Sequence, residues 1–210
     1  MVNIQIESVG FPFQEPGFVR LAVQVLTRAT AMGLLDKKKV IEDLVWDGYQ
    51  QRIAEMAKGG GIAMSLAAEA KSLQQGNEIG EYRGLVERIA VALEGSPVPD
   101  KEWKALLDVF APQDLAALLG TSASSVRRYS EGKRATPGAV AERLHSLALV
   151  VGDLAGAYND YGIRRWFNRK RKLLSGKAPA DLLTGSWEPG ARGPTSVREL
   201  AASLVALSAT

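Results

Sequence analysis

The chain has 210 residues, of which 46% are hydrophobic and 23% charged, a composition typical of a globular protein with one domain or two small ones. The absence of cysteine excludes disulfides, thiolate zinc sites and cysteine nucleophiles, and it favours a reducing, cytoplasmic environment. Because there is one histidine and the carboxylates do not cluster at ligand spacing, we predict neither a metal nor a cofactor.

Charge is distributed unevenly along the chain. Residues 1–110 contain 12 Lys/Arg and 15 Asp/Glu, a net charge of −3, whereas residues 111–210 contain 14 and 8, a net charge of +6. The basic half favours an anionic partner, although uneven surface composition would give the same counts. The N-terminal segment MVNIQIESVG lacks the pattern of a signal peptide, and no apolar run is long enough for a bilayer. We therefore expect a soluble protein without a membrane partner.

The N-terminal part is predicted to be mostly helical. Residues 1–17 alternate apolar and polar side chains at Val2, Ile4 and Ile6, which indicates a short strand or an extended arm. Apolar residues at helical spacing then predict four helices. These lie between Gly17 and Gly33, from an Asp36 N-cap to the Gly59–Gly61 run, over residues 62–73, and through residues 82–93.

The segment 95–99, with the sequence GSPVP, is the candidate domain boundary. We predict an N-terminal helical region of unknown role over residues 1–96, a helix-turn-helix domain over 97–158 and a small helical module over 159–210. The fold class is therefore all-α, with one short N-terminal strand as an option. A long helix is expected over 137–158, and a last helix is expected near Ser196, which would form a capping box with Glu199.

The most informative segment is PQDLAALLGTSASSVRRYSEGKR, residues 112–134. Its leucines bury one face of a short helix, and Gly120 ends that helix at a tight turn. Ser122 is then expected to cap a second helix that runs from Ala123 to about Glu131, with Val126 facing the first helix. This order of residues predicts a helix-turn-helix, although the same pattern also occurs in helical bundles that never bind nucleic acid.

The second helix is expected to enter a DNA major groove. Arginine can bind guanine with two hydrogen bonds, so Arg128 is the expected base-contacting residue. Gln113, Lys133 and Arg134 are expected to contact phosphates. The complete set of predicted DNA-binding residues is Gln113, Ser122, Ser124, Ser125, Arg127, Arg128, Lys133 and Arg134.

The stretch LAALLGTSASSVRRYSEG resembles the Xre-type helix-turn-helix. Residues 162–204 then resemble the toxin-binding domain of the Xre/MbcA/ParS-type antitoxins, and the whole resemblance covers about residues 103–207. The matching positions are Trp166-Phe167, Leu174-Ser-Gly176-Lys-Ala-Pro179, Leu182-Leu183, Gly185 and Val197.

This resemblance implies an antitoxin that neutralises a RES-domain toxin, an enzyme class that destroys NAD, by covering its active-site entrance. It also implies repression of the antitoxin's own operon through operator DNA, as a homodimer or a larger complex with toxin. The residues that we predict to contact the toxin are Trp166, Arg169, Lys170, Trp187, Arg192 and Arg198.

Several features have two interpretations. Trp187, in a Gly/Pro-rich loop, is either an exposed interface anchor or packed on its own domain. The six cations within residues 164–172 are either solvated or in contact with DNA or an acidic toxin. His145 is expected at the surface, without a role as a general base.

The function also has an alternative, a stand-alone helix-turn-helix transcriptional regulator with an N-terminal sensing or dimerisation region. We do not expect an enzyme, because residues 1–96 offer no nucleophile-base pair, no metal cluster and no credible phosphate loop.

Overall fold

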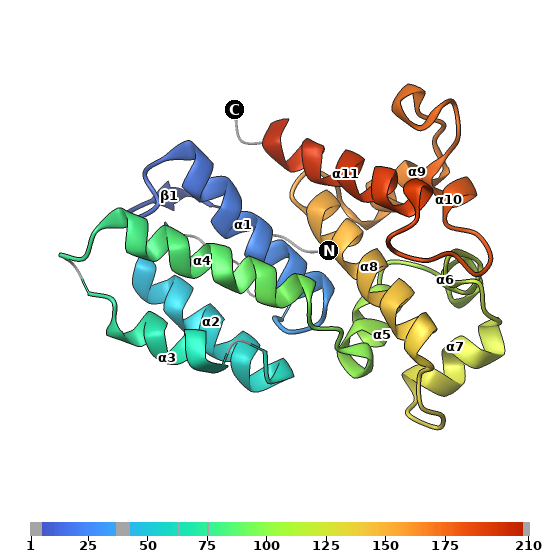
Figure 1. Ribbon diagram of the computed structural model, residues 1–210, viewed down its shortest axis with the longest axis horizontal. Coiled ribbons are helices and arrows are strands. Elements are labelled where there is room, and N and C mark those ends of the chain that lie inside the picture. Colours follow the sequence, from blue (N-terminus) through green and yellow to red (C-terminus); the bar gives the residue numbers. More distant parts are fainter. Residues whose placement is uncertain (1–5, 37–42, 63, 75, 208–210) are drawn as a thin grey trace.

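The computed structural model describes residues 6–36, 43–62, 64–74 and 76–207, and these form an all-α fold with one small two-stranded parallel sheet (Figure 1). The predicted fold class is thereby confirmed. The elements are β1 (Ser8–Val9), α1 (Pro16–Ala31), β2 (Asp43–Leu44), α2 (Trp46–Gly60), α3 (Met64–Ser72), α4 (Ile79–Glu94), α5 (Pro99–Leu107), α6 (Pro112–Leu119), α7 (Ala123–Ser130), α8 (Gly138–Ala155), α9 (Asp160–Asn168), the 3-10 helix η1 (Lys172–Leu174), α10 (Pro179–Leu182) and α11 (Arg192–Leu207). None of these helices is both long enough and apolar enough to cross a bilayer.

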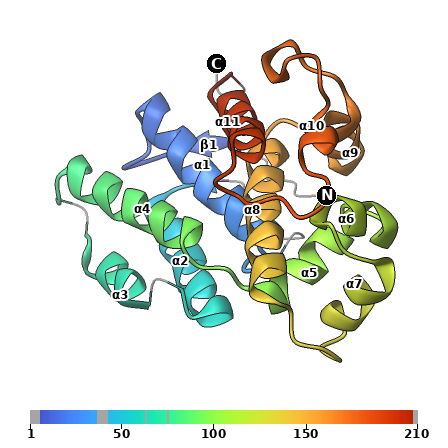
Figure 2. The same ribbon diagram turned by 45° about the vertical axis from the view of Figure 1, so that its right-hand side comes forward.

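The central helix of the fold is α8, around which α1, α5 and α11 pack (Figure 2). Every residue from Arg143 to Leu154 is buried. A helix that is covered on all sides needs apolar residues around its circumference rather than in one stripe. The predicted long helix is confirmed, but the few polar residues that it buries require partners within the protein.

The N-terminal helices form a bundle against one side of α8, with α1 and α4 packed together and α3 packed on both α2 and α4. The predicted start of the second helix at Asp36 was wrong, because Asp43 and Leu44 form β2 and α2 begins at Trp46, whereas its predicted end at the Gly59–Gly61 run is confirmed. β2 pairs with β1, and Leu44 is buried there, so pairing between distant segments overrides the local helical pattern. Residues 1–5 and 37–42, which include Val2, Ile4 and Ile41, lie outside the described residues.

The buried ion pair between Arg28 and Asp153 joins α1 to α8. Arg28 Nε lies 2.7 Å from Asp153 Oδ1, and its Nη2 lies 3.0 Å from Oδ2. Its Nη1 also donates to Glu94 at the end of α4, at 2.6 Å. Burial by itself would lower the pKa of Arg28, but the bonds to and charges of Asp153 and Glu94 raise it above its ordinary value. Arg28 thus links α4, which precedes the connection to α5, with α8, which follows it. The buried apolar residues on the two sides of this connection likewise form one cluster.

His145 is buried, so the prediction that it lies at the surface was wrong. Its Nδ1 lies 2.6 Å from Oε1 of Glu102, and its Nε2 lies 3.0 Å from the backbone oxygen of Glu94. The side of α8 that carries His145 faces α5 and the end of α4, which supply these partners.

The last helix also begins earlier than predicted. α11 starts at Arg192, so Ser196 lies inside the helix and the predicted capping box is wrong. Pro194 occupies the first turn, where a missing backbone N–H group is tolerated because that group would have no partner within the helix.

Candidate nucleic-acid interface

α6 and α7 form a helix-turn-helix whose local signals were visible in the sequence. Gly120 follows α6 with a φ of +61°, a left-handed conformation that glycine adopts without steric cost. The Oγ atom of Ser122 then caps α7 by accepting a hydrogen bond from the Ser125 backbone N–H at 3.1 Å. The predicted end of the first helix and the predicted N-cap of the second are both confirmed.

α7 is held by two buried side chains on its inner face. Val126 is fully buried, and Tyr129 stacks on Trp103 of α5 with ring centroids 5.7 Å apart. Figures 1 and 2 both show α7 at the edge of the molecule. Because its inner face is fixed, Arg127 and Arg128 project from the outer face and are exposed.

Most of the predicted DNA-binding side chains are exposed. Ser125 is half-buried, and the Ser122 hydroxyl is engaged as the cap and also lies 3.0 Å from the hydroxyls of both Ser124 and Ser125. The Ser122 hydroxyl therefore serves mainly to fix the start of α7, because its hydrogen bonds are made within the protein. The exposed members of the set are Gln113, Ser122, Ser124, Arg127, Arg128, Lys133 and Arg134.

The charges around α7 are only partly neutralised. Lys133 Nζ lies 2.8 Å from Oε2 of Glu131, and this hydrogen bond, with the charges of Lys133 and Arg127, lowers the pKa of Glu131. The Arg134 guanidinium lies over the Tyr129 ring, 5.6 Å from its centroid. Within the described residues Arg128 has no ion-pair partner, so its donors are free to contact another molecule.

The loop before α11 packs on the turn of the helix-turn-helix. The Trp187 indole N–H donates to the backbone oxygen of Leu118 at 2.7 Å, and only 8% of Trp187 is exposed. Trp187 is therefore buried and the exposed-anchor alternative was wrong, but its hydrogen-bond partner lies in the predicted helix-turn-helix domain and not in its own predicted module. At Gly120 a Cβ atom would lie only 1.9 Å from the backbone oxygen of Gly185, so this contact requires glycine.

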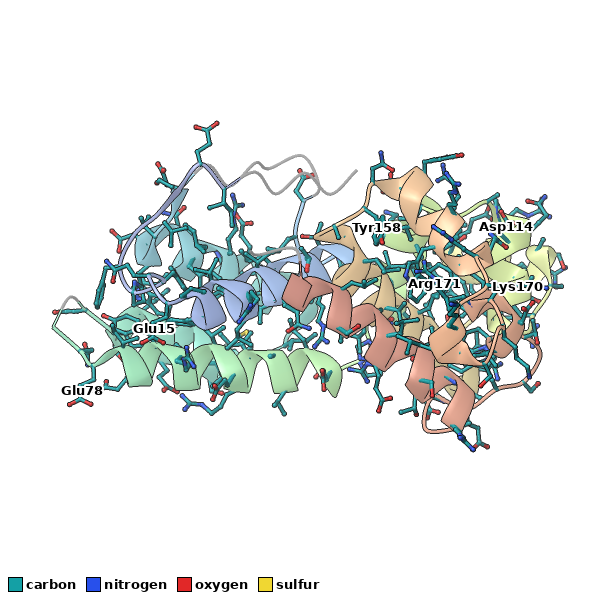
Figure 3. All side chains as sticks on the ribbon, turned by 90° about the horizontal axis from the view of Figure 1, so that it is seen from above. Glu15, Glu78, Asp114, Tyr158, Lys170 and Arg171 are labelled. Atoms are coloured by element: carbon teal, nitrogen blue, oxygen red, sulfur yellow. The ribbon has the colours of Figure 1, made fainter. Side chains whose placement is uncertain are left out.

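The residues predicted to contact a toxin divide into buried and exposed groups. Trp166 is buried beside Phe167, with the Arg171 guanidinium 5.2 Å from its ring centroid. Burial removes Trp166 from direct contact with a protein partner in this conformation, and it leaves only a small part of Trp187 accessible. Arg169, Lys170 and Arg192 are exposed, whereas Arg198 is half-buried with its Nη2 atom 2.9 Å from Glu94 Oε1. Figure 3 places Lys170 and Arg171 in the half of the molecule that holds the C-terminal module.

Comparisons with models of known protein families, with characterised proteins and with solved structures found no match to this chain. Among the described residues, no group of three or more His, Asp or Glu side chains is placed to hold a metal ion. The chemistry of the exposed face of α7 is therefore the main evidence on function.

Proposed function

We propose that the protein binds operator DNA through α7 and thereby represses its own operon, and that it also neutralises a RES-domain toxin by direct binding. The observation that supports DNA binding is the geometry of α7, which buries Val126 and Tyr129 and turns Arg127 and Arg128 outward. An arginine on the exposed face of a recognition helix can bind guanine in the major groove with two hydrogen bonds.

The remaining predicted contacts, from one neutral amide and two basic side chains, would fix the orientation on DNA. Gln113 lies in the first turn of α6, and Lys133 and Arg134 follow α7, so the three flank the recognition helix in sequence. Lys133 and Arg134 would neutralise phosphates and Gln113 would donate a hydrogen bond to one, and contacts of this kind carry little sequence information. One copy would cover one half-site, so two copies related by two-fold symmetry would bind a palindromic operator.

The proposed toxin contact depends on charge. Arg169, Lys170 and Arg192 are exposed in the C-terminal module, which fits a partner with an acidic surface. Neutralisation in this proposal is steric, because the bound antitoxin would cover the active-site entrance of the toxin.

DNA binding is tested by fluorescence anisotropy with the full chain and the DNA upstream of its own gene, at about 50 mM and about 200 mM salt. We expect Arg128→Ala to remove the preference for this DNA over an unrelated duplex, because it deletes the base contact. Arg88→Ala, an exposed arginine of α4, is the control and should bind as the unmodified chain does. Equal preference in the Arg128→Ala variant would contradict the proposal.

Toxin binding is tested by co-expressing the chain with the product of the neighbouring gene. We expect co-purification and rescue of growth, and we expect the double variant R169E/K170E to lose both while its DNA binding persists. Unchanged rescue by this variant would show that the toxin contact lies elsewhere.

The stand-alone transcriptional regulator remains the second candidate. It is favoured by the burial of Trp166 and Trp187, which removes two of the six residues expected to contact a toxin. Sequence-specific DNA binding without any stable complex with the neighbouring gene product would support this candidate over the antitoxin.

A further inference from the structure

A groove of about 620 Å³ lies between α8, the end of α4 and the loop that precedes α11. Arg143 and Ser146 line it from α8, Trp187 and Pro189 line it from the loop, and Arg198 lines it from α11. Its volume is in the range of sites that hold small molecules. No residue of α7 lines this groove, so a ligand here would not compete with the proposed DNA contact.

The most unusual residue in the groove is Arg143. Only 7% of it is exposed, yet Nε has no hydrogen-bond partner among the described residues. Within the described residues its guanidinium forms a single hydrogen bond, from Nη1 to the backbone oxygen of Trp187, at a long 3.4 Å. No carboxylate of the described chain forms an ion pair with it. A buried guanidinium normally has its charge and most of its five N–H donors satisfied, so an anion in the groove would provide what the described chain does not.

The other charges in the groove define what kind of anion fits. Glu94 is already bonded to Arg28 and to Arg198, at 2.6 and 2.9 Å, so Arg198 is neutralised within the protein. Glu142 and Glu188 also line the groove, and both are exposed. The groove therefore has a buried positive group and two negative groups at its exposed part.

We propose that this groove binds a small zwitterion of the α-amino acid class. Its carboxylate would accept hydrogen bonds from Arg143, and its ammonium group would lie toward Glu142 and Glu188. The side chain of the ligand would pack on Trp187 and Pro189. The two exposed carboxylates disfavour dianions such as phosphate monoesters, because like charges repel.

The test starts with the unmodified full chain and a panel of the standard amino acids, each followed by thermal shift and by titration calorimetry. We expect at least one amino acid to raise the melting temperature in a saturable manner. Inorganic phosphate and acetate at equal concentration should not do so. The amide of the bound amino acid, which lacks the carboxylate, should bind about tenfold more weakly or worse.

Variants then locate the ligand. Arg143→Met should abolish the shift, and the double variant E142Q/E188Q should weaken binding severalfold, whereas Arg165→Met, an exposed arginine of α9 outside the groove, should leave it unchanged. If Arg143→Met does not fold, the comparison of the amino acid with its amide on the unmodified chain still shows whether the ligand carboxylate is recognised. No shift with any amino acid, equal binding of the amide, or a full response in Arg143→Met would each overturn the proposal.

Discussion

The indole nitrogen of Trp187 lies 2.7 Å from the backbone oxygen of Leu118, and this hydrogen bond joins the loop before α11 to the last turn of α6. Carbonyl groups in the last turn of a helix have no partner within the helix, so an outside donor satisfies Leu118. The helix-turn-helix and the C-terminal module are thus packed together rather than linked loosely. A partner that displaces the loop would also disturb the turn that holds α7.

Trp187→Phe should destabilise the protein because it leaves the Leu118 oxygen buried without its donor. Trp166→Phe is the matched control, since the Trp166 indole nitrogen is buried but has no hydrogen-bond partner among the described residues. We expect Trp187→Phe to lower the free energy of unfolding by about 1–3 kcal/mol more than Trp166→Phe does, as measured by urea denaturation. Equal losses would mean that the hydrogen bond contributes nothing beyond the volume of the ring.

Gly120→Ala and Gly132→Ala separate backbone strain from steric overlap. Both glycines have positive φ, +61° and +68°, so both substitutions carry a strain of about 1–2 kcal/mol. A Cβ at residue 132 meets no atom within 4 Å, whereas one at residue 120 overlaps the Gly185 backbone oxygen. Gly120→Ala should therefore be the more destabilising by about 1–3 kcal/mol in thermal or denaturant unfolding. If the two variants have the same free energy of unfolding, the Gly185 backbone can move away from the added methyl group without loss of stability.

The elements that the sequence predicted well are those determined by neighbours along the chain. The helix predicted through residues 82–93 is found as α4, whose buried residues Tyr82, Leu85, Val86, Ile89 and Leu93 follow the 3.6-residue period of one helix face. The same is true of the turn at Gly120 and the cap at Ser122, whose signals lie within a few residues of each other. For the candidate site, these local signals predicted the position of α7 and the face on which Arg127 and Arg128 are exposed.

The elements that the sequence missed are determined by distant segments. His145 and Arg143 lie beside apolar positions of α8, and only the packing of α5 and of the loop before α11 on this helix buries them. The burial of Trp187 has the same cause, because its partner Leu118 lies 69 residues away in sequence. Asp153, charged within an apolar stretch, was the one visible signal of the buried network with Arg28, but a single sequence does not name its partner.

The Arg28–Asp153 pair should contribute far more to stability than an exposed pair of the same kind. Arg28→Met leaves the buried Asp153 carboxylate without its ion-pair partner, and we expect it to cost about 3–5 kcal/mol. Asp153→Asn leaves Arg28 paired with Glu94 alone, and we expect a smaller loss. Arg83→Ala breaks the exposed pair with Glu15 and should cost about 1 kcal/mol or less. A double-mutant cycle by denaturant unfolding measures the coupling between Arg28 and Asp153. Coupling no larger than that of Arg83 with Glu15 would contradict a structural role for the buried pair.

Glu131 should restrain the DNA affinity of the proposed interface, because it is bonded to Lys133 and lies near Arg127. The carboxylate is charged at neutral pH, as for an ordinary glutamate, and there it opposes the approach of phosphates; its lowered pKa extends the charged form to more acidic solutions. Glu131→Gln should release Lys133 and raise the affinity for duplex DNA by about two- to fivefold. Lys133→Ala should lower the affinity for all sequences alike and reduce the slope of log K against log salt by about 0.9. Anisotropy titrations over a range of salt concentrations measure both effects, with Glu69→Gln as a control on a carboxylate of α3. If Glu131→Gln weakens binding instead, Glu131 orients Lys133 toward the DNA rather than withholding it.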